Sequence, residues 1–230
     1  MGYIKSILKK VIPSGIRRTL RVIQEEWQFA LQQTYFRIFK KNELGKITGT
    51  HLLLNVGCGK ELKEGWVNID LIPCKGVYYA DVARRLPLKE GAFRHIHCEH
   101  LLEHLDYEQA KGFLNECLRI LEKDGCLRLI LPDAEKYLRA YCQNDRAFFD
   151  SLDYLGGKPF RTTMEVINQV FRMGGAHKFA WDMETLLMIL TETGFTRVVK
   201  SRLGDVAPDL NIDLTDYWRP IESLYVNAYK

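Results

Sequence analysis

The chain has 230 residues, of which 47% are hydrophobic and 27% charged, the composition of a globular protein. This balance excludes a disordered chain, and no apolar run reaches the roughly 18 residues that a membrane-spanning helix needs. No two of the six cysteines lie within four positions of each other, which argues against zinc knuckles and CxxC redox pairs and favours reduced thiols. The N-terminal residues lack a continuous apolar stretch and a cleavage site, so we expect a cytoplasmic protein.

The net charge of +4 is concentrated near the N-terminus. Residues 1–45 hold nine Lys or Arg against three Asp or Glu, a balance of +6, so the other 185 residues carry −2. Within this segment apolar residues recur at steps of three and four, which predicts a helix with one apolar face. The face consists of Ile16, Leu20, Ile23, Trp27, Leu31, Tyr35 and Ile38. The basic residues beside it are Arg17, Arg18, Arg21, Arg37, Lys40 and Lys41.

Two roles of this basic amphipathic helix are open. It suits the inner face of an anionic membrane, because apolar burial and lipid charge act together there. Alternatively, residues 1–41 pack on their own domain or on a second copy of the chain. We expect a helical extension over residues 1–45, a short linker at 42–46, and a second domain over 46–230.

From residue 50 onward, short apolar runs alternate with helical segments, which predicts an α/β fold with a mostly parallel sheet and ligands at the carboxyl ends of its strands. The predicted strands are 51–56, 66–70, 77–81, 93–98, 126–131, 195–199 and 223–229. The predicted helices are 101–121, which we expect Asp124-Gly125 to terminate, 134–142 and 185–193. Only a loop separates the last two strands, so we expect an antiparallel pair at the edge of the sheet.

Glycines and acids fall where these strands end. The first strand runs into Gly57-Cys58-Gly59, a turn at which a ligand can approach the backbone closely. The second and third strands end on Asp70 and Asp81, whose carboxylates suit the ribose hydroxyls and the amine of a nucleoside. A third glycine is absent, and residues 60–65 are too few for a phosphate-binding helix. We therefore expect a nucleoside-containing cofactor without phosphates.

Five motifs follow one another in a characteristic order: Leu54-Asn-Val-Gly-Cys-Gly59, Gly65-Trp-Val-Asn-Ile-Asp70, Leu86-Pro87, His100-Leu-Leu-Glu-His-Leu105 and Pro132-Asp133. In these motifs, residues 50–230 resemble the class I S-adenosylmethionine-dependent methyltransferases, specifically the small bacterial type 11-like family. The resemblance implies a Rossmann-like, doubly wound sheet of seven strands with an antiparallel edge strand. It also implies S-adenosyl-L-methionine as cofactor and methyl transfer to a small molecule or a glycan intermediate, as in cell-surface polysaccharide synthesis.

The same resemblance assigns residues to the cofactor. The loop Asn55 to Gly59 is expected to contact the methionine part, Asp70 the ribose, and Asp81 with Val82 the adenine. Glu99 and His100 are expected to flank the sulfonium. The complete expected cofactor site is Asn55, Gly57, Cys58, Gly59, Asp70, Leu71, Asp81, Val82 and Glu99.

A hydroxyl acceptor needs a proton acceptor, and histidine suits that role near neutral pH. His100 is the first candidate because it follows the strand end where cofactor and acceptor should meet, and His177 is the second. His104 is a weaker candidate, and each of these histidines could instead cap a helix or pack.

Two other functions remain as alternatives. His100, Glu103 and His104 match the H-x-x-E-H pattern of some zinc hydrolases, but that function leaves the glycine turn and both aspartates without a purpose. We therefore expect no metal. A non-catalytic S-adenosylmethionine-binding module is the other alternative. The balance of −2 outside the N-terminal segment lacks the basic surface of a nucleic-acid binder, so we expect no nucleic-acid partner.

Residues 144–180 combine aromatic and basic side chains, and we interpret them as a lid over the acceptor. These side chains are Phe148, Phe149, Tyr154, Phe160, Arg161, Phe171, Arg172 and Lys178. The alternative is that the aromatic residues fill a small separate core.

Overall fold

The computed structural model describes residues 41–72, 74–152, 160–205, 210, 213 and 219–230, together with 13, 16, 19–20, 23–24, 27–28, 30–31, 34–35 and 38. The chain divides into two compact units, residues 1–41 and 42–230. Each unit is described by itself. Among the described residues, no helix combines the length and the apolar character needed to cross a membrane.

In the first unit, the seven apolar residues of the predicted face are all helical. Their side chains, from Ile16 to Ile38, are between 46% and 66% exposed. Most of the basic residues that the sequence places beside them lie outside the described residues, and of Lys41 only the helical backbone is described.

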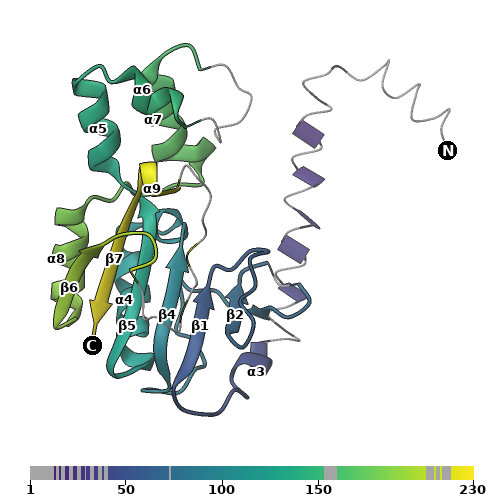
Figure 1. Cartoon of the computed structure of the whole chain (residues 1–230). Helices are drawn as coiled ribbons and strands as arrows, with labels where there is room; N and C mark the ends of the chain where they lie inside the picture. Colours follow the sequence, from purple (N-terminus) through teal and green to yellow (C-terminus); the bar gives the residue numbers. More distant parts are fainter. Residues whose placement is uncertain are drawn as a thin grey trace. The chain divides into compact units, whose positions relative to one another are not determined.

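The second unit is built on a seven-stranded sheet with the order β3-β2-β1-β4-β5-β7-β6 (Figure 1). The strands are β1 (Leu52–Val56), β2 (Val67–Asp70), β3 (Tyr78–Tyr79), β4 (Phe93–Glu99), β5 (Leu121–Pro132), β6 (Arg197–Ser201) and β7 (Ser223–Tyr229). Neighbouring strands are parallel except that β7 runs antiparallel to both β5 and β6. The sheet is the predicted Rossmann-like one, and the antiparallel strand lies second from the edge, inside β6.

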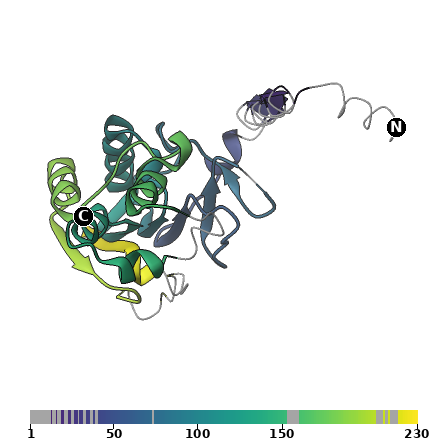
Figure 2. The same ribbon diagram turned by 90° about the horizontal axis from the view of Figure 1, so that it is seen from above.

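The described helices are α3 (Lys41–Leu44), α4 (Tyr107–Ile120), α5 (Ala134–Cys142), α6 (Arg146–Asp150), α7 (Thr163–Arg172), α8 (Met183–Thr193), α9 (Arg219–Glu222) and the 3-10 helices η1 (Leu102–His104) and η3 (Met173–Gly175). Helices α5, α6 and α7 gather beyond the carboxyl ends of the parallel strands (Figure 1). Viewed from above in Figure 2, α4 and α8 lie beside each other on one side of the sheet.

The helix predicted over residues 101–121 is wrong at both ends. Asp106 caps α4, because its side chain accepts a hydrogen bond from the Gln109 backbone N–H, and this cap separates α4 from η1. Leu121 has extended backbone angles and pairs with Phe93, so the strand begins at once after Ile120. Apolar residues continue at helical spacing up to Leu121, so periodicity alone predicts a helix that ends too late.

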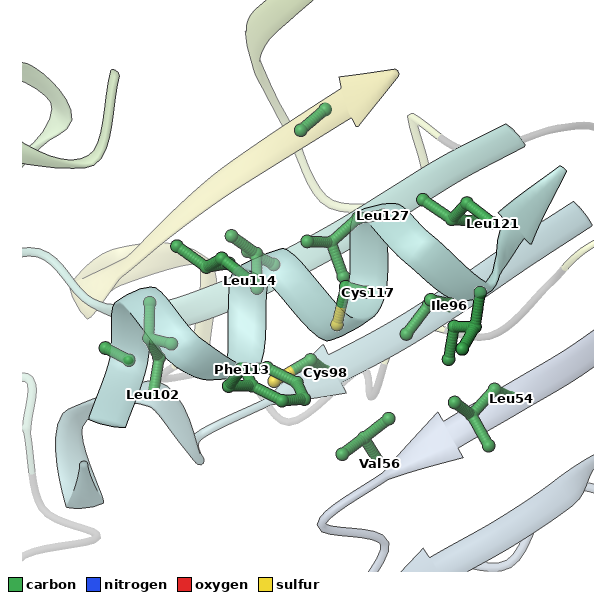
Figure 3. Close-up of a cluster of buried hydrophobic side chains, with 14 of the residues drawn as sticks. Leu54, Val56, Ile96, Cys98, Leu102, Phe113, Leu114, Cys117, Leu121 and Leu127 are labelled. Atoms are coloured by element: carbon green, nitrogen blue, oxygen red, sulfur yellow. The ribbon is translucent and has the colours of Figure 1, made fainter. Parts of the chain in front are cut away.

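One face of the sheet is apolar. The buried side of α4, formed by Ala110, Phe113, Leu114, Cys117 and Ile120, belongs to the same core as β1 and β4 (Figure 3). The strands contribute Leu54, Val56, Ile96 and Cys98 to it. Leu44 is also buried in this core, so the segment expected as a linker is part of the second unit.

The opposite face of the sheet carries a polar row across neighbouring strands. The row consists of Asn55, His97, Arg128 and Asn227, which are paired in register. Arg128 is fully buried, and its guanidinium donates to Asp213 Oδ1 at 3.1 Å and to Asn227 Oδ1 at 3.0 Å. The ion pair with Asp213 compensates this buried charge.

Residues 144–180 contribute most of the second hydrophobic cluster of this unit, which α5 and α9 complete. It consists of Tyr137, Ala140, Phe148, Phe149, Leu152, Phe160, Val166, Ile167, Val170, Phe171 and Ile221. Of the aromatic residues proposed for a lid, Tyr154 lies outside the described residues and the four phenylalanines pack in this cluster. The lid function itself stays a prediction.

Candidate functional site

Three cavities adjoin one another at the carboxyl ends of the parallel strands. The Asp70 cavity, of about 560 Å³, is lined by Gly57, Asp70, Leu71, Asp81, Val82, His104 and neighbouring residues. The Gly-loop cavity, of about 230 Å³, is lined by Asn55, Gly57, Cys58, Gly59, Glu99, His100 and neighbouring residues. The His177 cavity, of about 270 Å³, is lined by His100, Glu103, His104, His177, Arg219, Glu222 and neighbouring residues. Each pair of cavities shares at least one lining residue, so the three cavities lie next to one another.

The turn after β1 is shaped by Gly57. Its φ angle is +65°, and a Cβ at this position would lie 2.4 Å from Leu101 Cδ1. The backbone N–H groups of Gly57 and Cys58 both donate to Ile69 O, at 2.9 and 3.2 Å, and these bonds tie the turn to β2. Burial and the nearby Asp70 carboxylate raise the pKa of the Cys58 thiol to about 12, so Cys58 is not a nucleophile at neutral pH.

Asn55 holds the loop that follows this turn. Its side-chain amide donates to Glu61 O and to Asn68 Oδ1, both at 2.9 Å, and Asn68 Oδ1 also accepts from the Lys63 backbone N–H at 2.9 Å. Both amide hydrogens of Asn55 are therefore used within the protein. Asn55 borders the Gly-loop cavity and acts on it by fixing the loop.

The two predicted carboxylates reach the Asp70 cavity from adjacent strands. Asp70 Oδ2 accepts from the Gly59 N–H at 2.9 Å, and Oδ1 accepts from the Ile72 N–H at 2.7 Å. Asp81 forms an ion pair with Arg84 at 2.9 Å. The wall therefore offers two oriented carboxylates, the arrangement that a diol and an amine of one ligand require.

Glu99 and His100 end β4 among charged partners. Glu99 forms an ion pair with Arg219 and lies 3.1 Å from His97 Nε2. His100 Nδ1 lies 3.3 Å from Glu103 Oε1, and its Nε2 lies 3.6 Å from Glu222 Oε1. Burial opposes protonation of His100, but the hydrogen bond with Glu103 and the charges of both carboxylates outweigh it and raise the pKa of His100.

His177 lies on the other side of the His177 cavity. Its Nδ1 donates to Val170 O, and its ring stands edge-on to His104 with 4.7 Å between ring centroids. Burial lowers the pKa of His177, so its imidazole is neutral over a wider pH range than that of His100. Both predicted catalytic histidines thus border the same cavity, in different charge environments.

The structure brings every predicted site residue to this set of cavities. Asn55, Gly57, Cys58, Gly59 and Glu99 border the Gly-loop cavity, whereas Asp70, Leu71, Asp81 and Val82 border the Asp70 cavity.

Sequence reasoning missed two charged residues of the site. Arg219 gave no signal, because its partner Glu99 is 120 positions away. Glu222 belongs to the segment Glu222-Ser-Leu-Tyr225, whose spacing assigns it no role.

Comparison with known proteins supplies two similarities. Residues 67–129 match a protein family described as a methyltransferase domain. The fold is similar to that of a SAM-dependent methyltransferase from Archaeoglobus fulgidus, with a TM-score of 0.50, 19% identity, and coverage of 89% of this chain and 94% of that one. A SAM-dependent methyltransferase from Thermotoga maritima gives a TM-score of 0.48 with 16% identity and coverage of 91% and 97%. No curated protein matches the sequence.

Proposed function

We propose that the chain is a class I S-adenosylmethionine-dependent methyltransferase and that it methylates a hydroxyl group of a small molecule or glycan intermediate. The family match over residues 67–129 and the similar fold support the first part of this proposal. The observation that carries this proposal is that the three cavities are neighbours, with Gly57, His100 and His104 each lining two of them. The cavity with the two oriented carboxylates therefore lies next to a cavity lined by histidines. Methyl donor and acceptor can therefore meet beside His100.

The residues present fit S-adenosylmethionine. Gly57 borders both the Asp70 cavity and the Gly-loop cavity without a side chain, and the Asp70 and Asp81 carboxylates face the first of these. Among the described residues no helix lies between β1 and β2, so no helix N-terminus is aimed at a phosphate there. The site thus suits a nucleoside cofactor that carries no phosphates.

We assign the cofactor as follows. Asp70 accepts hydrogen bonds from the ribose hydroxyls, and Asp81 with Val82 contacts the adenine. The Gly-loop cavity holds the methionine part, with Glu99 and His100 at the reacting end. S-adenosylmethionine supplies an electrophilic methyl group on a positively charged sulfur. The protein then has to align the acceptor with that methyl group. Alignment of well-oriented reactants lowers the activation barrier by up to about 7–11 kcal/mol.

We propose His100 as the group that takes the proton of the acceptor hydroxyl. It borders both the Gly-loop cavity and the His177 cavity, whereas His177 borders only the latter. The carboxylates of Glu103 and Glu222 stabilise the positive charge that His100 gains with the proton.

Transfer of labelled methyl groups tests this function. Full-length protein is incubated with S-adenosylmethionine labelled in the methyl group and with lipid-linked, nucleotide-linked and free sugar fractions of a cell extract. We expect label in one of these fractions only when the protein is present. Binding of S-adenosylmethionine without any labelled acceptor would instead indicate a non-catalytic binding module, and stoichiometric zinc without such binding would indicate a hydrolase.

We also propose that the apolar face formed by the seven helical residues from Ile16 to Ile38 rests on an anionic membrane surface, which would bring the enzyme to lipid-linked acceptors at the inner face of the membrane. The support is the exposed apolar face of this helix together with the balance of +6 in residues 1–45. Polysaccharide precursors on lipid carriers are acceptors of this kind.

Vesicle flotation tests the membrane proposal. We expect the full chain to float with vesicles that contain phosphatidylglycerol and not with pure phosphatidylcholine vesicles, and we expect Trp27→Glu to abolish flotation. Gln33→Glu, at a position that is not three or four residues from any member of the apolar face, controls for the added charge. A concentration-dependent dimer that ignores both vesicle types would contradict the proposal and would assign the face to self-association.

A further inference from the structure

Three side chains with metal-binding atoms converge at the wall of the His177 cavity. They are Glu103 and His104 of η1 and His177, which follows η3, and their ligand atoms all lie within 4.8 Å of one another. All three border the cavity. No sequence motif groups them, because 73 positions separate His104 from His177.

Both histidines are held in the form that binds metals. His104 Nδ1 lies 3.1 Å from Ala176 O, and His177 Nδ1 is hydrogen-bonded to Val170 O. A carbonyl oxygen can only accept, so each Nδ1 carries the proton and each Nε2 keeps its lone pair. Metal-ligating histidines commonly donate their second ring N–H to a backbone carbonyl in this way, which fixes the orientation of the ring.

The carboxylate of Glu103 is buried and poorly satisfied. The residue is 3% exposed, and neither carboxylate oxygen has a well-formed hydrogen bond within the described part of the chain. His100 Nδ1 pairs with Oε1 at 3.3 Å, so Oε2 is the oxygen that remains without a partner among the described residues. A buried polar atom without a partner is costly, and a cation bound at Oε2 would supply one.

Backbone bonds hold the two segments against each other. Glu103 O accepts from the Lys178 N–H at 2.8 Å, so the residue after His177 is tied directly to η1. His104 N donates to Leu101 O at 3.0 Å, which closes the turn that carries both η1 ligands. The three ligands are therefore positioned by the fold before any cation arrives.

We propose that Glu103, His104 and His177 bind a divalent cation of the zinc class and leave one coordination position open toward the His177 cavity. Two imidazole nitrogens with one carboxylate are a donor set that zinc and its neighbours among the transition metals accept, whereas magnesium and calcium prefer oxygen donors. The site differs from the H-x-x-E-H pattern of the sequence, because the nitrogens of His100 lie beside Glu103 and Glu222 instead.

If the proposed function is correct, the open coordination position of the cation can bind an oxygen of the methyl acceptor. His104 also borders the Asp70 cavity, so the cation lies close to the methyl donor. An acceptor oxygen bound to the cation would be oriented and made more acidic. His177 then serves as a ligand, and His100 remains the proton acceptor.

Cobalt binding tests the site without any need for activity. Full-length protein without a polyhistidine tag is stripped with a chelator and titrated with Co²⁺, followed by its visible d–d absorption, and with Zn²⁺, followed by calorimetry. We expect one equivalent of each ion. His104→Ala and His177→Ala should each weaken binding by more than the about 10- to 100-fold that follows loss of a hydrogen-bond partner of a ligand.

His51→Ala is the matched control, because this histidine side chain is 74% exposed and pairs with Glu122 outside the site. It should bind both ions like the wild type. Glu103→Gln tests the buried ligand, with circular dichroism to verify that each variant is folded. Absence of binding by the wild type, or unchanged binding by both His104→Ala and His177→Ala, would overturn the proposal.

The same samples are titrated with S-adenosylmethionine. Wild-type protein that binds S-adenosylmethionine and no metal would sink the cation site and leave the proposed function intact. Wild-type protein that binds the metal and not S-adenosylmethionine would sink the proposed function and support the cation site.

Discussion

The two halves of the site are built in different ways. The cofactor half, which consists of the Asp70 and Gly-loop cavities, draws its predicted residues from the ends of β1 to β4 and the turns that follow them. The acceptor half, the His177 cavity, joins η1, α7 and α9, which are far apart in the sequence. Strand ends and turns determine the first half locally, whereas the second exists only after long-range packing.

The polar groups of the two halves also find different partners. In the cofactor half, Asp70 and Asn55 bond to nearby backbone and to Asn68 in the adjacent strand. Asp81 likewise pairs with Arg84, three positions away. In the acceptor half, His100 lies 3.6 Å from Glu222 Oε1, and these two residues come from distant segments of the chain. We therefore expect a substitution to act locally in the first half and to disturb several charges at once in the second.

Of the substitutions considered, Gly57→Ala, in the cofactor half, should destabilise the protein most. A non-glycine residue at this φ angle costs about 1–3 kcal/mol, and the collision with Leu101 adds a further packing cost of about 1–3 kcal/mol. We expect the free energy of unfolding, measured in urea, to fall by about 2–6 kcal/mol. Gly59→Ala is the matched control, since its φ is also positive but a Cβ there meets nothing within 4 Å. Equal losses for both variants would contradict the collision.

Acid should lower the free energy of unfolding through His95 on β4, the strand whose carboxyl end borders both halves of the site. Burial, aided by the neighbouring charges of His97 and Arg128, lowers the pKa of His95 on β4 to about 3, whereas an unfolded histidine has a pKa near 6.5. Below pH 6.5 the unfolded chain therefore takes up a proton that the folded chain does not. The free energy of unfolding should decrease as the pH falls, by about 2 kcal/mol at pH 5 from this residue alone.

Urea unfolding at pH 7 and pH 5 checks this effect. His95→Gln should show a smaller loss between the two values than the wild type does. An identical loss in both proteins would mean that His95 is not kept neutral by the fold.

Asp70→Ala and His177→Ala, one in each half of the site, should differ in their affinity for S-adenosylmethionine. Loss of charge-assisted hydrogen bonds to the ribose should weaken S-adenosylmethionine binding at least about tenfold in calorimetry, because such bonds contribute about 1.5–3 kcal/mol. His177→Ala, in the acceptor half, should leave this affinity within about twofold. If both variants lost affinity equally, the division of the site would be wrong.

Thr162→Ala should have the smallest effect on the free energy of unfolding. It tests whether α7, in the acceptor half, can be destabilised without any change in cofactor binding. The Thr162 side chain accepts from the Glu165 N–H at 3.2 Å and caps α7, the helix that lines the His177 cavity. Removing this cap should cost about 1 kcal/mol of unfolding free energy and leave S-adenosylmethionine affinity unchanged. Thr162→Ser retains a hydroxyl and should restore most of the loss. If Thr162→Ala also weakened S-adenosylmethionine binding, the two halves of the site would not be independent, contrary to this prediction.

The sequence predicted the cofactor half well because its signals are local. A glycine turn and two strand-ending acids are readable from Gly57, Asp70 and Asp81, and the structure places them on one wall. The sheet was predictable for the same reason, since each strand is a short apolar run.

The acceptor half could not be read in this way. The contacts of His100 with Glu222 and of His104 with His177 join positions that no periodicity links. The start of β5 was also hidden, because Leu118 and Leu121 continue the helical spacing although Leu121 is already extended. Such features depend on which segments pack together, and that is settled only by the folded chain.

Competitive binding to the full-length wild-type protein tests the central claim most directly. Calorimetric titrations with S-adenosylmethionine, S-adenosylhomocysteine and NAD⁺ compare a phosphate-free nucleoside cofactor and its product with a dinucleotide. We predict one site that binds the first two ligands in competition and does not bind NAD⁺. Folded protein that binds NAD⁺ and neither of the other two would contradict the assignment of the site.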